Sequence, residues 1–278
     1  MTDKPQDIEA YKKWLSDNHK VEIAQAAKHY ELISGMIRMK FVESELWTTI
    51  RDSLQQFDSD YQAGHNGFPL WASTFPLPDL LTKSFTSFLE KTFRRNVLDN
   101  IKWDKAPKDR IGSGWILPSN WFSRINDITR TCFVVKYFDG VQYLATQLEQ
   151  VCRIHNTPFH VHYEARDEGY YAAHVYATYN LSLPGLDWTT EEVPCSIELQ
   201  ITTQLQDVIR HMLHSHYRTR RMQSHSEHPW KWKWNSKSPE FATNYMGHIL
   251  HYLEGLIVDI RDKSTPPQPL ESIDHEHA

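Results

Sequence analysis

The sequence has few cysteines and nothing that would place it in a membrane. Its 278 residues include three cysteines, Cys132, Cys152 and Cys195, which stand apart in apolar stretches. An odd number without close spacing argues against a disulfide framework and favours a reducing, cytoplasmic compartment. No apolar run approaches the roughly 18 residues that a spanning helix needs, and the first residues lack a secretory pattern. We therefore expect a cytoplasmic protein with no membrane partner.

Glycine and proline are nearly absent from the first sixty residues, where only Pro5 and Gly35 occur. Both residues are unfavourable inside helices, so their scarcity favours helical structure. Apolar side chains recur there at helical spacing, for example at Leu46, Ile50, Leu54 and Phe57. With a further helix expected over residues 79–98, these patterns predict a helical N-terminal region spanning residues 1–100.

The pattern then changes to short strands between helices. Residues 132–137 form an apolar run, and residues 159–164, 170–183 and 194–201 alternate as strands do. Segments with apolar residues at helical spacing follow the first and the last of these predicted strands. The order strand, helix, three strands and helix predicts an α+β fold with a mixed sheet flanked by helices.

The end of the chain contains three further segments. An amphipathic helix over residues 240–261 closes the predicted core domain, which spans residues 101–263. Before it, residues 230–234 alternate Trp and Lys, which favours an exposed strand or an edge loop. The proline-rich residues 264–278 are predicted to form a mobile tail.

Glu198 and Gln200 are the first candidate site residues. They lie in the alternating run 195–203, whose apolar side chains point to the opposite face of the predicted strand. A carboxylate and an amide two residues apart on a strand can face a ligand, although such pairs are more often solvated surface. Asp127 precedes the strand at residues 132–137, so two carboxylates can converge on one Mg²⁺, which takes one or two protein carboxylates and leaves sites for phosphate oxygens.

Tyr170 is the candidate aromatic platform. It follows Gly169 and shares a strand face with His174. Stacking of a nucleobase on such a side chain contributes roughly 1–3 kcal/mol. The alternative is ordinary cross-strand packing.

Residues 208–237 form a local basic block in a chain whose net charge is −5. Its lysines and arginines lie close together in the sequence, which favours binding of a polyanion or of an acidic protein. Their charges act on such a partner over roughly 10 Å. The candidate RNA-binding residues are Arg210, Arg218, Arg220, Arg221, Lys231 and Lys233. Nearby histidines, among them His211 and His214, leave a structural zinc site as a less favoured alternative, because no cysteine pair supports it.

Together these segments resemble the synthetase domain of the RelA/SpoT family, over roughly residues 101–217. Asp127 matches the Mg²⁺-binding Asp of the family's Asp-x-x-Gly-x-Arg strand, and Glu198 with Gln200 matches its Glu-x-Gln pair. Tyr170 matches the Tyr that stacks on the acceptor base. The remaining matches are His174, which ends the Gly-Tyr-x-x-x-His motif, and Arg166, a basic residue just before that motif.

The departures from the family pattern concern arginines. Cys132, Tyr171 and Thr202 stand where the family has arginine. The family's basic ATP-binding loop has no clean match, and its register stays open. Candidates for gripping ATP in this region are Lys105, Lys108, Arg110, Ser113, Arg124 and Arg130.

The resemblance implies a nucleotidyltransferase-like core that transfers pyrophosphate from ATP, with Mg²⁺, to a ribose 3′-hydroxyl. Fewer arginines on the acceptor side favour an acceptor without a 5′-polyphosphate. This points to the toxic, single-domain branch of small alarmone synthetases, acting on the 3′-CCA end of tRNA and paired with an antitoxin protein. The alternatives are a nucleotide pyrophosphokinase that makes (p)ppApp or (p)ppGpp, and a non-catalytic nucleotide or RNA binder. A homo-oligomer is also compatible with the branch.

Overall fold

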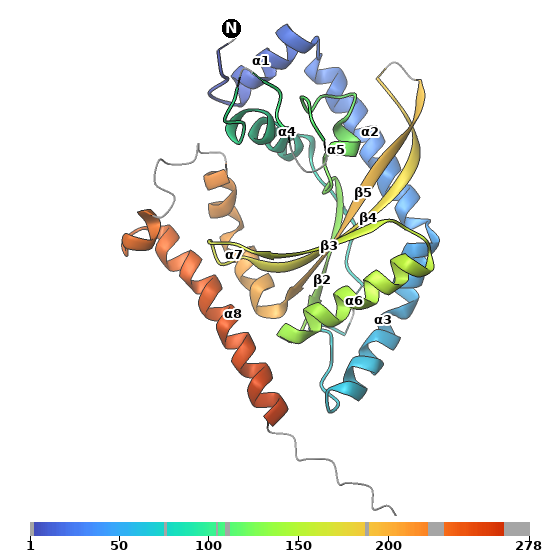
Figure 1. Ribbon diagram of the computed structural model, residues 1–278, viewed down its shortest axis with the longest axis vertical. Coiled ribbons are helices and arrows are strands. Elements are labelled where there is room, and N and C mark those ends of the chain that lie inside the picture. Colours follow the sequence, from blue (N-terminus) through green and yellow to red (C-terminus); the bar gives the residue numbers. More distant parts are fainter. Residues whose placement is uncertain are drawn as a thin grey trace, which may run out of the picture.

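A computed structural model describes residues 3–74, 77–103, 105–108, 112–186, 189–221 and 231–263. It confirms the predicted α+β fold (Figure 1). A mixed sheet has the strand order β1-β2-β5-β4-β3, in which β2 and β5 are parallel and the other pairs are antiparallel. The strands are β1 (Leu81–Thr82), β2 (Thr129–Val135), β3 (Phe159–Ala165), β4 (Tyr171–Pro184) and β5 (Thr190–Thr203).

Helices form the N-terminal region, as predicted. They are α1 (Ile8–His19), α2 (Ile23–Val42), α3 (Glu45–Gly64) and α4 (Phe85–Phe93). Asp7 and Ser44 cap α1 and α3 by accepting hydrogen bonds from backbone N–H groups of the first turn. The predicted stripe of α3 is buried. Since one apolar cluster contains side chains from these helices and from the sheet, the domain boundary at residue 100 stays a prediction.

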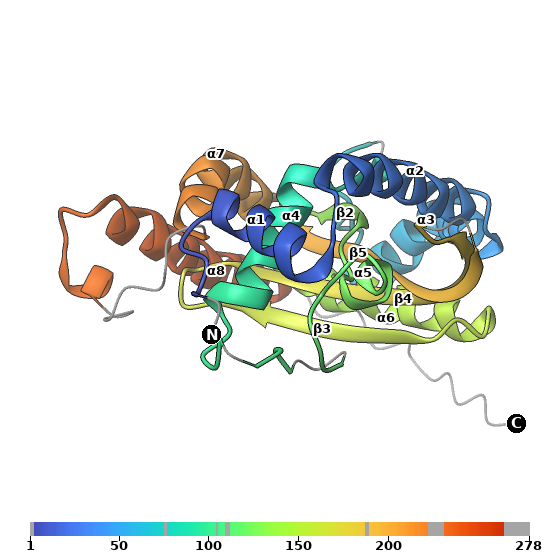
Figure 2. The same ribbon diagram turned by 90° about the horizontal axis from the view of Figure 1, so that it is seen from above.

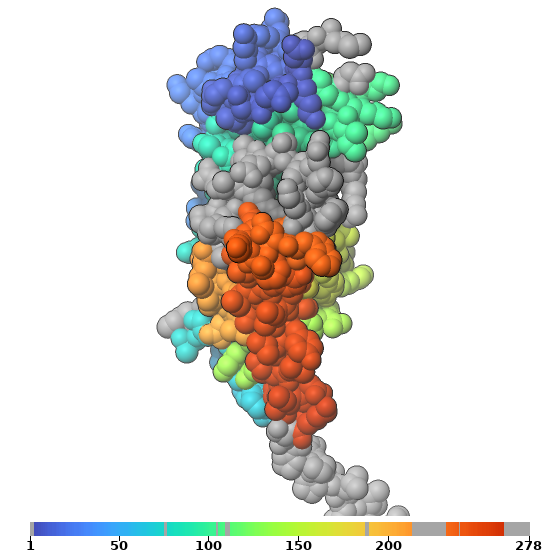
Figure 3. Space-filling view, turned by 90° about the vertical axis from the view of Figure 1, so that its left-hand side faces the viewer, coloured from blue at the N-terminus to red at the C-terminus, as the bar shows by residue number. Residues whose placement is uncertain are grey.

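The remaining helices surround the sheet. They are α5 (Trp121–Arg124), α6 (Phe138–Ile154), α7 (Gln204–Arg221) and α8 (Pro239–Lys263). Helix α6 contacts β4, β5 and α3, and in Figure 2 the long helix α2 lies above the strands. Figure 3 shows α8 as a ridge along one side of the molecule. None of the helices in the described ranges is long and apolar enough to cross a membrane.

Two predicted elements were wrong. Residues 79–98 are not one helix, because β1 pairs with β2 and Ser84 then caps α4, which continues as a π-helix over Arg94–Leu98. The Trp and Lys alternation is not a strand, because Lys231–Trp234 forms a 3₁₀ helix. Trp232 is buried there against Tyr245. Four residues are too few to distinguish the two-residue period of a strand from the period of a helix. The predicted tail, residues 264–278, lies outside the described residues.

Candidate active site

Polar side chains gather on one face of the sheet, opposite the apolar core. In β5, alternation sends Ile197, Leu199 and Ile201 into the core and leaves Glu198 and Gln200 on the other face, as predicted. The register aligns Arg130 of β2 and Tyr176 of β4 with Glu198, and it aligns Cys132 and His174 with Gln200. Three strands far apart in the sequence therefore supply one polar surface.

Three donors hold the carboxylate of Glu198. His174 Nδ1 donates to Glu198 Oε1 over 2.6 Å, and the Tyr176 hydroxyl donates to the same oxygen over 3.1 Å. Gln200 Nε2 donates to Oε2 over 3.0 Å. Glu198 and His174 are only 4% and 5% exposed. Because an ionised carboxylate only accepts hydrogen bonds, these donors fix its orientation on the sheet.

Two lysines bracket Asp127. Lys91 Nζ lies 2.7 Å from Asp127 Oδ1, and Lys83 Nζ lies 3.1 Å from Oδ2. Burial opposes ionisation of Asp127, but the two ammonium groups prevail and hold its pKa well below the usual range. Burial also lowers the pKa of Lys91 to about 8. Asp127 is therefore an ionised carboxylate held between two lysine side chains.

Sequence reasoning missed both lysines. Lys83 follows β1, and Lys91 lies on α4 between Leu89 and Thr92, which are both buried. A lysine on the buried side of a helix rarely goes without a partner, and this was the available signal for Lys91. Lys83 carried no comparable signal, because β1 has only two residues.

The hydroxyl of Tyr176 donates to Glu198, and the charge of Asp127 also acts on it. Burial is the main cause of its raised pKa, followed by the charge of Glu198, and the charge of Asp127 raises it further. Both carboxylates are thus within electrostatic reach of one hydroxyl on the polar face. Arg130 adds a positive charge nearby. The charge of Asp127 raises the pKa of Tyr30, and the charge of Arg130 lowers it.

The predicted acceptor side lies at the turn between β3 and β4. The Tyr170 hydroxyl donates to His174 Nε2 over 3.3 Å, which joins the aromatic platform to the Glu198 network. The Arg166 guanidinium lies 5.4 Å from the Tyr170 ring centroid and pairs with Glu164 over 2.6 Å. The structure therefore brings together all the residues predicted for the acceptor side.

Arg210 lies on this acceptor side, although the sequence placed it in the basic block. Its positive charge lowers the pKa values of both Cys132 and Tyr170, although burial raises them overall, that of Cys132 to about 11. Arg210 is half-buried, and its Nη2 lies 2.5 Å from Asp207 Oδ1. One guanidinium from α7 therefore approaches Cys132, which stands where the family has arginine.

The predicted ATP-binding residues occupy different settings. Lys105, Lys108 and Ser113 are exposed, and Arg110 lies outside the described residues. Arg124 is only 5% exposed and donates from Nη1 and Nη2 to the carbonyls of Ser113 and Gly112 over 3.1 and 3.2 Å. Its contacts hold the loop in place, whereas Arg130 lies on the polar face itself.

The basic block is only partly described. Arg218, Arg220 and Arg221 belong to α7, and Lys231 begins the 3₁₀ helix, but their side chains lie outside the described part of the structure. Lys233 Nζ pairs with Asp167 in the β3–β4 turn over 3.3 Å. Lys233 thus contacts the turn that precedes Tyr170.

Asp127 and Glu198 offer the type of ligand that a magnesium ion shared with nucleotide phosphates would use. Carboxylate oxygens are the ligands that Mg²⁺ prefers, and it commonly uses one or two of them. Each oxygen has two lone-pair directions, so the observed contacts leave capacity for a metal. Among the described residues, no three His, Cys, Asp or Glu side chains are close enough to form a metal site without other ligands.

No protein-family model and no curated protein matches the sequence. Among solved structures, a GTP pyrophosphokinase family protein from Streptococcus pneumoniae is 14% identical with a TM-score of 0.48, covering 91% of this chain and 93% of that one. Small alarmone synthetase 1 from Bacillus subtilis is 14% identical with a TM-score of 0.46, covering 78% and 90%. The structure of the same synthetase bound to its product pppGpp is 15% identical with a TM-score of 0.47, covering 82% of this chain and 98% of that one.

In structure the chain is similar, at low identity, to the small alarmone synthetases that its sequence resembles.

Proposed function

We propose that this chain transfers pyrophosphate from ATP to a ribose 3′-hydroxyl, with the 3′-CCA end of tRNA as the acceptor. What supports the proposal is the Glu198 carboxylate, which hydrogen bonds from His174, Tyr176 and Gln200 orient on the polar face. Asp127, which two lysines hold, supplies a second carboxylate. Two carboxylates on one polar face, with lysine and arginine beside them, suit the transfer of a charged phosphoryl group. Such reactions depend mostly on positioning and charge stabilisation.

Glu198 is the proposed general base. The acceptor 3′-oxygen attacks the β-phosphorus of ATP and its proton passes to Glu198, while the bond from that phosphorus to the bridging oxygen breaks and AMP leaves. His174 and Gln200 hold the base in orientation through their hydrogen bonds. Mg²⁺, held by Asp127 and Glu198, supplies charge neutralisation on the phosphates when it is bound.

The donor and acceptor occupy opposite ends of this polar face in the proposal. Tyr170 stacks on the acceptor base, and Arg166 lies over the same ring. Arg130 and the exposed cations Lys105 and Lys108 grip ATP, together with Ser113. Arg124 positions the loop that carries Ser113, and Arg110 is a further proposed contact.

The identity of the acceptor follows from charge. Cys132, Tyr171 and Thr202 provide no guanidinium for a 5′-polyphosphate. The basic block, including Arg218, Arg220, Arg221, Lys231 and Lys233, is proposed to contact the acceptor arm of tRNA, so binding would weaken steeply with salt. Modification of the CCA end would block aminoacylation, which makes the chain a toxin in the cytoplasm.

One observation favours the alternative acceptor, a purine nucleotide. The charge of Arg210 acts on Cys132 and Tyr170, so Arg210 provides one cation on the acceptor side, where Cys132 replaces the arginine of the family. In that case the products are (p)ppApp or (p)ppGpp. Arg210 is then a phosphate contact and not part of an RNA-binding surface.

The outer side of α8 supports the proposal of a protein partner, an antitoxin or a second copy of the chain. Large apolar side chains at spacings of three and four residues are exposed along it, including Met246, Ile249, Leu253, Leu256 and Ile260. An exposed apolar stripe of this kind is typical of a surface that another protein covers.

Product analysis with γ-labelled ATP tests the proposal. The protein is incubated with bulk tRNA or with GDP, GTP or AMP, and the products are separated by size. Label in RNA is expected, and Glu198→Gln should abolish it. Glu9→Gln is the matched control, because that side chain is 74% exposed and far from the polar face.

Each other result has a defined meaning. Label in free nucleotide alone, reduced by Arg210→Gln, replaces tRNA with a nucleotide acceptor. Absence of any transfer, together with no calorimetric binding of a magnesium complex of an ATP analogue, leaves a non-catalytic binder.

A further inference from the structure

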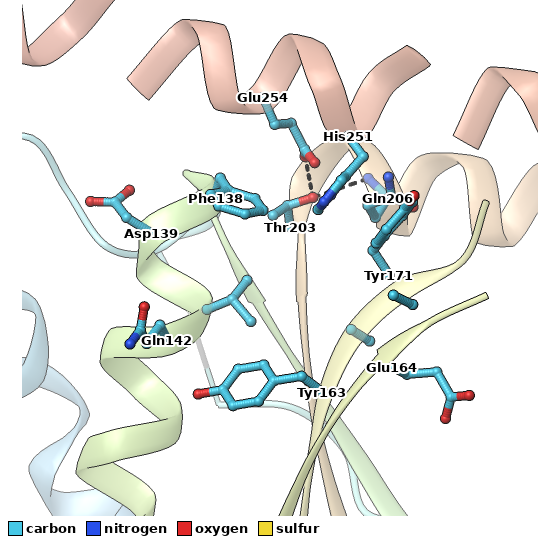
Figure 4. A pocket seen from close by; sticks show the side chains of 13 residues that line it. Phe138, Asp139, Gln142, Tyr163, Glu164, Tyr171, Thr203, Gln206, His251 and Glu254 are labelled. Carbon is cyan, nitrogen blue, oxygen red and sulfur yellow. Dashed lines mark hydrogen bonds between the residues drawn. The ribbon is translucent and has the colours of Figure 1, made fainter. Parts of the chain in front are cut away.

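A separate cavity of about 320 Å³ lies on the opposite face of the sheet from Glu198. It is enclosed by the start of α6, by β3 and β4, by the end of β5 and by α8 (Figure 4). Tyr171 and Thr203 belong to it, and alternation places their side chains on the face away from Tyr170 and Gln200. The proposed transferase site and this cavity are therefore distinct.

Aromatic rings form much of the wall. The Tyr171 and His251 rings stack with centroids 3.5 Å apart, and the Phe138 ring meets His251 edge-on at 4.9 Å. Tyr163 lines the cavity from β3 (Figure 4). Burial lowers the pKa of His251, and the nearby His248 lowers it further, so a charge on the His251 ring is disfavoured. These walls suit a flat, uncharged ring system.

Glu254 supplies one unused acceptor. Its carboxyl group is 5% exposed, and Oε1 accepts a hydrogen bond from the Thr203 hydroxyl. Its other oxygen, Oε2, is buried without a hydrogen-bond partner. The Gln206 amide donates to the Gly247 carbonyl over 3.2 Å and also lowers the pKa of Glu254, although burial raises that pKa overall. A buried acceptor of this kind is costly unless a donor reaches it, so it favours a ligand that carries an N–H group.

The charges around the cavity exclude phosphate. Among the residues that the structure describes, no lysine or arginine lines it. Asp139 is engaged by Arg261 over 2.9 Å, and Glu164 is engaged by Arg166 over 2.6 Å. In Figure 4 both of these carboxylates point away from the cavity. A phosphorylated ligand would thus find no cation here and one buried carboxyl group.

From this geometry we infer that the cavity binds a small, uncharged, planar nitrogen heterocycle without phosphate, whose ring N–H donates to Glu254 Oε2. The volume is at the lower end of the roughly 300–1,000 Å³ that ligand pockets span, which suits one or two fused rings. The site is independent of the proposed transferase activity, because its lining residues include none of those assigned to that reaction.

Calorimetry on the full chain at pH 8, above the Glu254 pKa of about 7, tests the inference with three probes. Indole has the ring and the N–H, benzofuran has the same shape without the N–H, and indoxyl phosphate adds a phosphate group. We expect saturable binding of indole, about tenfold weaker binding of benzofuran, and no binding of indoxyl phosphate. The tenfold figure corresponds to one net hydrogen bond.

Variants locate the binding. Val141→Phe fills the cavity and should abolish it, whereas Tyr170→Leu removes the aromatic platform of the other face and should leave it unchanged. Glu254→Met removes the acceptor at similar size and should bring the affinities for indole and benzofuran together. Circular dichroism and the unfolding midpoint establish that each variant is folded.

Any of four results overturns the inference, and the first three concern the ligand and the cavity. They are the absence of indole binding at millimolar concentration, binding that survives in folded Val141→Phe, and binding of indoxyl phosphate as tight as that of indole. An unchanged preference for indole in Glu254→Met also removes the assigned hydrogen bond and with it the inference.

Discussion

The Nδ1 atom of His174 lies 2.6 Å from the Oε1 atom of Glu198, and both side chains are buried. The register of β4 and β5 produces this contact. It places His174 beside Gln200, which is two residues from Glu198 on the same face of β5. The imidazole also accepts from Tyr170 through Nε2, over 3.3 Å. The proposed base and the proposed stacking platform are therefore connected by one ring.

His174 is thus a positioning residue whose removal should slow transfer without abolishing it. We expect His174→Ala to reduce kcat by about 10- to 100-fold, the range typical of residues that orient a catalytic group. His174→Asn should recover part of the loss, because its amide can donate to Glu198 in place of Nδ1. The pH dependence of kcat is the second measurement, since a reoriented base shifts it. Equal losses in both variants with an unchanged pH profile would falsify the positioning role.

Asp127 should stabilise the fold as well as serve the proposed site. Asp127→Asn leaves the half-buried Lys83 and Lys91 without their counter-charge, and breaking a fully buried pair costs about 3–5 kcal/mol, which is the upper bound here. Lys91→Met should cost less, because Lys83 still pairs with Asp127. Urea unfolding measures both changes.

The double variant Asp127→Asn with Lys91→Met provides the control. It should be more stable than Asp127→Asn alone, because one of the two stranded ammonium groups is gone. A double variant as unstable as the sum of the two single changes contradicts the pairing.

The sequence predicts much of this site because alternation alone assigns the faces of β5. Glu198 and Gln200 share a face whatever the neighbours of the strand are. The order of strands and helices likewise predicts the mixed sheet. The motif resemblance added Asp127, Tyr170 and His174. The register places His174 beside Gln200, and the Tyr170 hydroxyl joins His174 by a hydrogen bond.

The remainder depends on tertiary packing, which no local pattern specifies. Lys83 and Lys91 reach Asp127 because β1 pairs with β2 and α4 packs behind them. Arg210 approaches Cys132 only because α7 turns back over β2 after β5. The cavity at Glu254 requires α8 to return to the sheet, and spacing within α8 does not determine where it lies.

Gly169 and Gly247 should be sensitive to an added methyl group. Gly169 has φ of +76°, and a Cβ atom there would lie 2.4 Å from the Asn244 carbonyl oxygen. Gly169→Ala must therefore separate the β3–β4 turn from α8, which displaces Tyr170. We expect a loss of stability well above the roughly 1–2 kcal/mol that a left-handed backbone alone costs, together with a raised KM for the acceptor.

Gly67 offers a matched control for that prediction. Its φ is +79°, but a Cβ atom there would meet nothing within 4 Å. Gly67→Ala should show the backbone cost alone and leave KM unchanged. Similar stability losses in the two variants would show that the contact with α8 contributes little.

Glu254 should make the fold less stable as the pH rises. Burial raises its pKa from 4.5 to about 7, so the folded chain binds the proton more tightly than the unfolded chain does. The resulting stabilisation is complete below the unfolded pKa of 4.5 and is lost as the pH rises through about 7. The shift corresponds to at most about 3 kcal/mol.

Urea unfolding of the wild type and of Glu254→Gln at pH 5 and pH 8 measures this contribution. Glutamine does not titrate, so the stability of the variant relative to the wild type should increase between the two pH values. Because every other titrating group is shared by the two proteins, the difference isolates Glu254. A constant difference between the proteins at both pH values would mean that Glu254 ionises in the fold as it does in the unfolded chain, and the buried carboxyl group would then have to be reached by water.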